Sequence, residues 1–246
     1  MIELPFSTHD MGRVRFGRSP LWELVTAVRA LTSPEPVGVH ASWLRQVRPR
    51  LVHVDLALLT TLIRPAGYIP DFLVPVPRNR SPTVQSGLAQ VAATDPGLVT
   101  AQLTHLAGHP LAQQGPGRER RAALIHELLA DPAAGLARIV AELDRWWQVA
   151  IGPHWQRMRA LLHDDITFRL GELADGGVQQ VFRSLHPRIA FAGDMLRVTK
   201  YYSGRIDLGQ RGLLLIPCVF AWPDVLVSTA DPTVTSLTYS PRGLGR

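Results

Sequence analysis

Residues 146–169, WWQVAIGPHWQRMRALLHDDITFR, gather tryptophans, two histidines and an Asp-Asp pair into one segment. Imidazoles and carboxylates at suitable spacing could hold a metal ion or act as a general acid and base. On a helix that begins at Pro153, His154 and His163 would point to opposite sides, because each residue turns the helix by about 100°. His154 and Asp165 share a side but lie roughly 16 Å apart along the axis, too far for one metal ion to bridge. The spacing therefore predicts a structural segment without a metal or catalytic centre of its own.

The remaining residues of this segment follow the same interpretation. Asp164 and Asp165 would point about 100° apart on a helix, so they do not form a pair of carboxylates sharing one site. The apolar side chains recur at the intervals that place them on one face of a helix. These side chains are Trp155, Met158, Leu162, Ile166 and Leu173. We therefore expect the aromatic residues and the methionine to belong to a core.

The junction between two predicted helices at Gly152-Pro153 could still line a small-molecule pocket. Aromatic walls with a few polar groups are typical of such pockets. The candidate ligand-pocket residues are Trp147, His154 and Arg157. The alternative is that His154 is a hydrogen-bonded histidine near the start of a helix.

Other potential motifs are incomplete. His105 and His109 have the i, i+4 spacing of metal ligands, but Pro110 indicates that the helix is ending there. The stretch HELLA at His126 lacks the second histidine of a zincin motif, and no P-loop, nucleophile elbow or dinucleotide fingerprint occurs. Cys218 lies in an apolar run, where a buried, inert thiol is expected. We expect no catalytic residue, no metal site and no cofactor, and hence a protein that is not an enzyme.

Composition places the chain among ordinary globular proteins. It has 246 residues, of which 46% are hydrophobic and 19% charged, and it contains a single cysteine. An apolar run of about 18 residues and a secretory leader are both missing, so we expect a cytoplasmic protein without a membrane span. The formal charge of +6 would suit an anionic partner, although the arginines lie in scattered clusters that are typical of solvated faces.

Helical periodicity dominates to about residue 186. Ser19-Pro20 is a typical helix start, with Ser as cap and Pro at the first helical position. Further helices are expected at 43–51, 56–63, 84–93, 98–106, 120–130 and 136–150, and from Pro153 onward. Prolines between residues 64 and 82 predict an ordered loop, and AQQGPGRER, residues 112–120, is expected to be the most mobile one.

Strand patterns replace helical ones after Leu185. RIAFAGDMLRVTKYY predicts a hairpin, and GLLLIPCVF predicts a buried strand in which Pro217 implies an edge or a bulge. VLVST and TSLTYS are shorter candidates. The predicted fold class is α+β, a mostly helical body over residues 1–187 followed by a small antiparallel β region over residues 188–246.

Five segments, taken in order, resemble the long N-terminal region of a bacterial family of ArsR-type winged-helix transcriptional regulators. They are RVRFGRSPLWEL, GYIPDFL, PHWQRMRALLHDDI, GLLLIPCVFAWP and YSPRGLG, and the resemblance covers essentially the whole chain. It implies a region that senses a small-molecule effector, forms a homodimer, or does both. DNA reading would belong to a winged helix that follows this region in the family and that the sequence up to Arg246 does not contain.

The resemblance transfers no effector-binding residue, and it disfavours a metal sensor because the metal-sensing relatives use clusters of Cys or His. Our first hypothesis is therefore a sensory and dimerisation region of a transcriptional regulator. The alternatives are a small-molecule-binding protein or enzyme with a pocket at the Trp146–Trp155 corner, and a nucleic-acid binder driven by its arginines. An enzyme would have His154, Arg157 and Asp164 or Asp165 as its polar groups.

Overall fold

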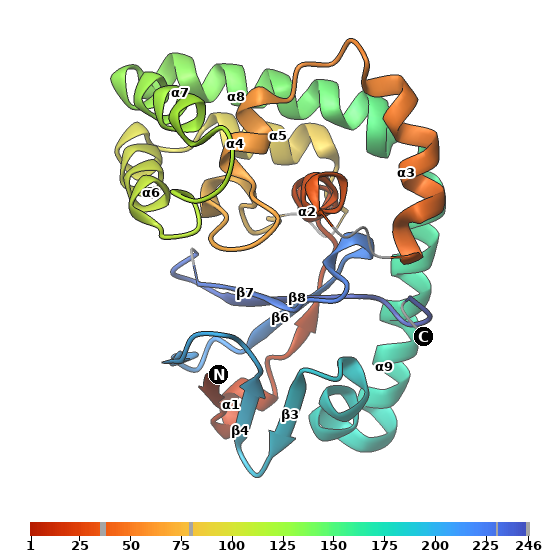
Figure 1. Cartoon of the computed structure of the whole chain (residues 1–246). Helices are drawn as coiled ribbons and strands as arrows, with labels where there is room; N and C mark the ends of the chain where they lie inside the picture. The colour runs from red at the N-terminus through yellow and green to blue at the C-terminus, as the bar shows by residue number, and fades with distance from the viewer. Residues whose placement is uncertain (35–37, 79–80, 230, 245–246) are drawn as a thin grey trace. The chain divides into compact units, whose positions relative to one another are not determined.

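The computed structural model describes residues 1–34, 38–78, 81–229 and 231–244, and these form two compact units (Figure 1). Residues 19–156 form the first, which we call the helical unit. The second, which we call the β unit, joins residues 1–18 to residues 157–246. The N-terminal segment thus belongs to the same unit as the C-terminal strands. The boundary at residue 187, where the sequence pattern changes from helical to strand-like, stays a prediction.

The helical unit contains seven α-helices among its described residues. They are α2 (Pro20–Thr32), α3 (Ala41–Val47), α4 (Ala57–Leu62), α5 (Val84–Ala92), α6 (Pro96–Gly108), α7 (Arg118–Ala130) and α8 (Pro132–Trp146). Short 3-10 turns cover Gly38–His40, Arg48–Leu51, Asp71–Leu73 and Gly152–His154, and a π-helical turn covers Trp147–Ile151. The helix predictions are confirmed to within a few residues at each end, except that residues 48–51 form a 3-10 turn and the last turn of the 136–150 helix is a π-helix.

A cap followed by proline starts three of these helices. Ser19 accepts a hydrogen bond from the backbone N–H of Trp22, and Pro20 is the first helical residue. Asp95 before α6 and Asp131 before α8 act in the same way, each with proline next in the chain. Such caps satisfy backbone donors that the first turn leaves without partners, which explains why these starts are readable from sequence.

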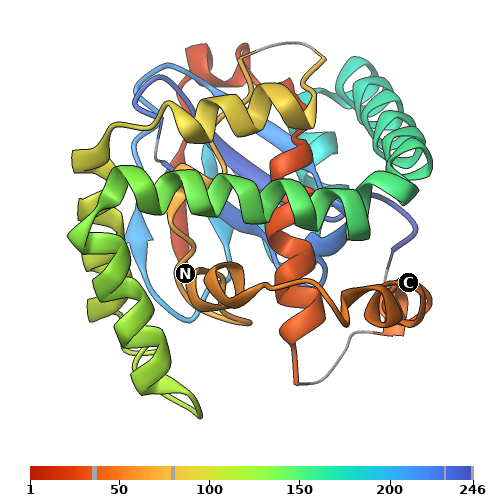
Figure 2. The same cartoon turned by 90° about the horizontal axis from the view of Figure 1, so that it is seen from above.

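Tryptophans form the centre of the helical unit, as predicted. Trp146 is fully buried, and its indole N–H donates to the carbonyl of Leu24 on α2 at 3.0 Å. Trp43 donates in the same way to the carbonyl of Ala150 at 3.0 Å, and the two indoles meet edge to face. Figure 2 shows α8 passing across α2 and beside α5. The indoles therefore fix how α8 crosses its neighbours while their polar atoms stay satisfied.

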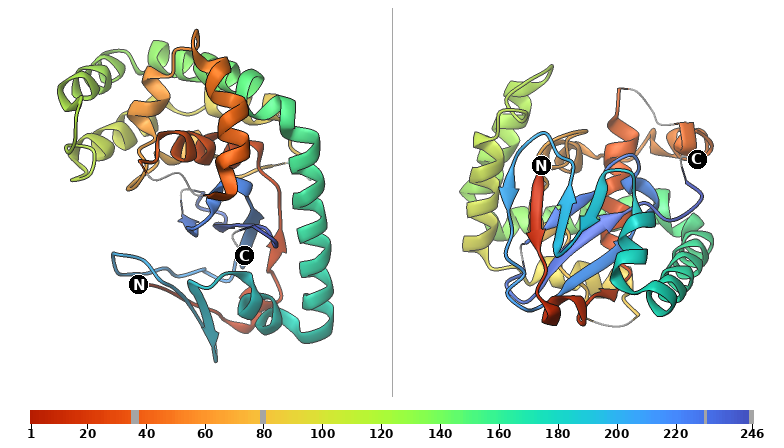
Figure 3. Two further views of the ribbon diagram at one scale, coloured as in Figure 1. Left: turned by 45° about the vertical axis from the view of Figure 1, so that its right-hand side comes forward. Right: turned by 90° about the horizontal axis from the view of Figure 1, so that it is seen from below.

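Helix α9 (Trp155–Leu185) starts after the Gly152-Pro153 break and continues into the β unit (Figure 3). It is interrupted at Gly177, whose φ of 66° and ψ of −167° are not helical. Met158, Leu162 and Asp165 are buried on it, while Asp164 is exposed. The two neighbouring carboxylates thus point in different directions, as their spacing predicted.

The described residues of the β unit form two four-stranded sheets. One has the order β3-β4-β1-β5 and the other β2-β6-β8-β7. The strands are β1 (Ile2–Pro5), β2 (Arg15–Phe16), β3 (Ile189–Ala192), β4 (Met195–Val198), β5 (Gly204–Arg205), β6 (Leu213–Pro217), β7 (Leu226–Ser228) and β8 (Thr235–Tyr239). A short helix α1 (Thr8–Met11) and a 3-10 turn (Val219–Ala221) complete it, and a shared apolar core joins both sheets to the end of α9.

The α+β class is confirmed, but the sheets are mixed and not purely antiparallel. β1 pairs with β4 antiparallel and with β5 parallel, and β6 is parallel to both β2 and β8. The N-terminal strands were missed because four and two residues are too short to show an alternating pattern. Their pairing depends on contacts with residues nearly 200 positions away, which no local pattern reports.

The prediction that Pro217 marks an edge or a bulge needs correction. β6 lies between β2 and β8, and Pro217 is its last residue. Cys218 N–H donates to Tyr239 of β8, and the carbonyl of Leu215 accepts from Gly17 on the opposite side. Backbone groups of successive residues in a strand point alternately to its two neighbours, so the backbone nitrogen of Pro217 points to the same side as the backbone of Leu215. That is the side of β2, which has already ended at Phe16. The missing N–H therefore interrupts no ladder.

Three predictions fall partly on residues outside the described ranges. The stretch SPEP, residues 33–36, predicts the end of the first helix and includes residues 35–36; the proline-rich loop includes residues 79–80, and the terminal RGLG segment runs past residue 244. Within the described ranges, no helix combines the length and low polarity that crossing a bilayer would require.

Candidate functional site

The predicted pocket residues are divided between the two units. Trp147 is buried, and its ring meets that of Trp155 edge to face at 5.3 Å. His154 is half-buried at the same corner of the helical unit, whereas Arg157 is exposed and belongs to the β unit, where it begins the second of that unit's two segments. Ligand binding by these three side chains stays a prediction.

A cavity of about 340 Å³ lies elsewhere in the helical unit, among α4, α6, α7 and the loop that joins α6 to α7. This volume is at the small end of the range for small-molecule pockets. Its lining residues are Thr61, Ala107, Ala112, Gln113, Arg118, Arg121, Ala122, Ile125, His126 and Leu129.

Glu142 of α8 holds α4 in place beside this cavity. The backbone N–H of Leu59, in the first turn of α4, donates to Glu142 Oε1 at 2.8 Å. Burial raises the pKa of Glu142, while the backbone donors of Leu59 and Leu58 work against that rise. The carboxyl group thus caps a helix that has no side-chain cap of its own, and α4 in turn presents the buried Thr61 to the cavity.

Arg121 organises the α6–α7 loop on the other side of the cavity. Its guanidinium donates to the carbonyls of Pro116 at 2.5 Å, Gln114 at 2.6 Å and Ala112 at 3.4 Å. Gly117, with a φ of 72°, makes the sharp entry into α7 that brings these carbonyls above the guanidinium. The mobility expected of this loop stays a prediction, but three hydrogen bonds tie it to α7.

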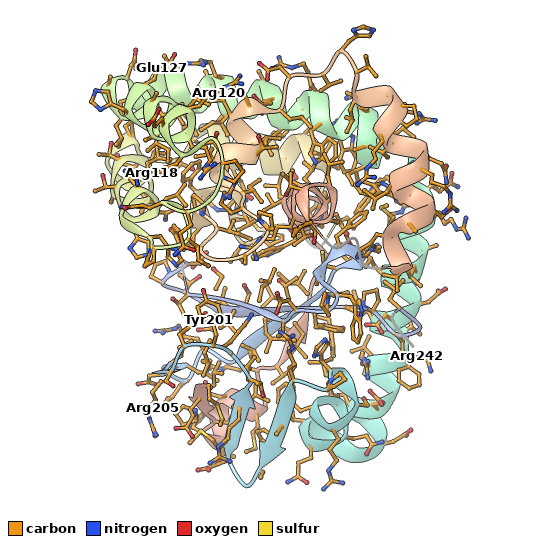
Figure 4. All side chains as sticks on the ribbon, viewed as in Figure 1. Arg118, Arg120, Glu127, Tyr201, Arg205 and Arg242 are labelled. Carbon is orange, nitrogen blue, oxygen red and sulfur yellow. The ribbon has the colours of Figure 1, made fainter. Side chains whose placement is uncertain are left out.

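The cavity has a positive charge at its α7 end. Arg121 is only 8% exposed, and burial, followed by repulsion from Arg64, lowers the pKa of its guanidinium. Arg64 reaches the same loop, because a Cβ placed at Gly115 would lie 3.8 Å from its Nη2. Arg118 adds an exposed guanidinium in the first turn of α7 (Figure 4). Because no carboxylate is among the lining residues, the cavity pairs an apolar wall with an uncompensated cationic end.

Two other candidate places have the wrong geometry for a ligand. A second cavity between α2 and α5 has about 10 Å³ of free volume, enough for roughly one water molecule. His105 contacts the ring of Tyr68, and His109 ends α6 and accepts the N–H of Leu111 on its Nδ1. The described residues contain no group of three His, Cys, Asp or Glu side chains that could hold a metal ion.

Sequence reasoning missed this cavity because its walls come from segments up to 68 positions apart. It also assigned Arg121 to a solvated cluster with Arg118 and Arg120. One signal was available: Arg121 precedes the buried Ile125 and Leu128 by four and seven residues, which places it on the buried face of α7.

The fold and the cavity define an α+β protein with a helical unit that contains an arginine-lined cavity. The chain belongs to the DUF5937 family of unknown function, whose sequence model matches residues 110–242, more than half of the chain. The matched range includes α7 and the loop before it, so most of the cavity lining lies within it. No curated protein and no solved structure matches the chain.

Proposed function

We propose that this chain is the sensory and dimerisation region of a cytoplasmic bacterial transcriptional regulator of the ArsR winged-helix type. The DNA-reading winged helix would lie outside these 246 residues. Five ordered segments that resemble such regulators support the assignment, and the surplus of arginines is consistent with a protein that works beside DNA.

The observation that carries the sensory role is the cavity among α4, α6 and α7. A small molecule there would contact three separate elements at once, and Arg121 would couple it to the α6–α7 loop. A ligand shifts a conformational equilibrium only by binding one arrangement better than another. A cavity whose walls come from different elements meets that condition, because any relative shift of α4, α6 and α7 changes the ligand's contacts.

In this mechanism the effector selects one arrangement of the helical unit in each protomer of a homodimer. The selected arrangement changes how the two winged helices are presented to successive half-sites on the DNA.

A cavity-filling substitution in the complete regulator tests the proposal. Ala122 lines the cavity on α7, and Ala122→Trp would fill part of it. Ala123→Trp is the matched control, since Ala123 is exposed on the same helix and does not line the cavity. We expect Ala122→Trp to change expression from the regulator's own promoter by about tenfold, a typical allosteric coupling. Ala123→Trp should leave expression unchanged.

Two outcomes would overturn the proposal. One is a complete reading frame whose product has no DNA-binding module. The other is a reporter that responds to neither variant although circular dichroism shows both to be folded.

A further inference from the structure

We propose that the ligand of the α4–α6–α7 cavity is a small amphipathic carboxylate, a monoanion with a compact apolar body. The inference rests on the proposed sensory role for the cavity's biological purpose, but the chemistry of the ligand follows from the lining alone. The charge, the hydrogen-bond donors, the apolar wall and the volume of the cavity each limit the class of ligand that it can bind.

The surroundings of the Arg121 guanidinium determine which ligand charge the cavity favours. Arg121 is buried, lies near Arg64, and has hydrogen-bond partners that are neutral backbone carbonyls. Its Nε is also buried, without a hydrogen-bond partner among the described residues. A buried cation that faces another cation gains stability when an anion approaches, because the repulsion is then replaced by attraction. The lining therefore favours an anion over a neutral or cationic ligand.

The available donors limit how much negative charge the cavity can bind. Three of the five N–H groups of Arg121 donate to loop carbonyls, which leaves this residue few donors for a ligand beside its charge. Arg118 is exposed and has no ion pair or hydrogen bond within the described chain, which leaves its planar guanidinium able to bind a carboxylate through two parallel bonds. The first turn of α7 also has no side-chain cap, and its N–H groups reinforce the same preference. One carboxylate matches this donor set better than a phosphate dianion.

The rest of the wall excludes a purely polar ion. It is formed by Ala107, Ala112, Ala122, Ile125 and Leu129. An inorganic anion would leave this apolar surface in contact with water, whereas a short hydrocarbon or a single ring would cover it. Thr61, Gln113 and His126 add a few polar contacts that could orient the body of the ligand. The volume of about 340 Å³ suits a molecule with one ring or a short chain.

Calorimetric titration of the full chain with three probes tests the inference. Benzoate carries both features, its isosteric amide benzamide carries the ring without the charge, and inorganic phosphate carries charge without the ring. We expect saturable, stoichiometric binding of benzoate, with benzamide and phosphate each weaker by about tenfold or more, because each lacks one of the two contributions.

Two arginine variants on one helical turn locate the site. Arg118→Gln keeps a polar, though shorter, side chain and removes the charge at the cavity, and we expect benzoate binding to weaken by about tenfold or more. Arg120→Gln is the matched control, since Arg120 is exposed on the same turn and does not line the cavity (Figure 4). It should change the affinity by less than about twofold, the effect of a screened surface charge.

The outcomes separate this inference from the proposed function. Equal binding of benzoate and benzamide, an unchanged affinity in Arg118→Gln, or no carboxylate binding up to millimolar concentration would each overturn the ligand class. If the reporter responds to Ala122→Trp in any of those cases, the sensory role stands with a different ligand. If benzoate binds as expected while the reporter ignores Ala122→Trp, the ligand class stands and the sensory role fails.

Discussion

The side chain of His186 shows how burial changes the chemistry of a single residue. It is 6% exposed, its ring packs at 5.4 Å from Trp222, and its Nδ1 accepts the backbone N–H of Arg188 at 3.1 Å. Burial lowers the pKa of this imidazole from 6.5 to about 4, and the charge of Arg188 adds to the effect. The folded protein therefore keeps His186 neutral at pH values where the unfolded chain would protonate it.

His186 should make the protein less stable in mild acid. Because the folded pKa is the lower one, its contribution is complete above pH 6.5 and is lost as the pH falls toward 4. The loss amounts to at most about 3 kcal/mol. Urea unfolding between pH 7 and pH 4 measures it, and His186→Asn should lose less stability over that range than the natural chain. The exposed His126→Gln is the control and should behave like the natural chain; identical pH profiles for all three proteins would contradict the assignment.

At the scale of elements, helix ends and breaks depend on a few residues with special backbone or capping roles. Asp165 ties α9 to the last strand, since it accepts the Tyr239 hydroxyl and the backbone N–H of Arg242, both at 2.8 Å. Gly177 interrupts α9 in a region of φ/ψ space that is essentially restricted to glycine. The direction of the final part of α9 therefore depends on that one position.

Two glycine-to-alanine substitutions in α9 should have opposite effects. Gly177→Ala forces a Cβ into the left-handed region and should cost about 1–3 kcal/mol of the free energy of unfolding. Gly171→Ala meets no atom within 4 Å in a helical stretch and should stabilise the fold by about 1 kcal/mol. Thermal unfolding of both variants checks this prediction. If both midpoints shift in the same direction relative to the natural chain, alanine is not strained at position 177.

For the whole molecule, the charge of +6 is distributed over a surface whose only lysine is Lys200. Arginine is well suited to binding phosphate, yet the clusters do not follow one element that could enter a DNA groove. We therefore expect the 246-residue chain to lack sequence-specific DNA binding of its own. The proposed dimerisation role also predicts that the chain forms a homodimer.

Two measurements on the purified chain check these expectations. A gel-retardation assay at about 150 mM salt should show no preference for the DNA upstream of its own gene over unrelated duplex, because unspecific phosphate contacts weaken steeply with salt. Light scattering should give a mass twice the 27.1 kDa of one chain. A sequence-selective complex would instead support the arginine-driven nucleic-acid binder, and a monomer would remove the dimerisation role.

The sequence by itself determined the helices to within a few residues at each end, and the tryptophan core. Ser19-Pro20, the apolar spacing of α8 and the Gly152-Pro153 break are local signals, because caps, periodicity and proline act within a few residues of the chain. It also determined the family, since that relation is read directly from residues 110–242.

Only the tertiary structure decided the mixed sheets and the cavity. β1 pairs with β4 across nearly 200 positions, and the lining around Arg121 brings Thr61 together with residues 107–129. A helix pattern shows that Arg121 is on the inner face of α7, but it does not show that Arg64 and three loop carbonyls surround it. Such neighbours are set by packing between distant segments, which leaves no periodic trace in either segment alone.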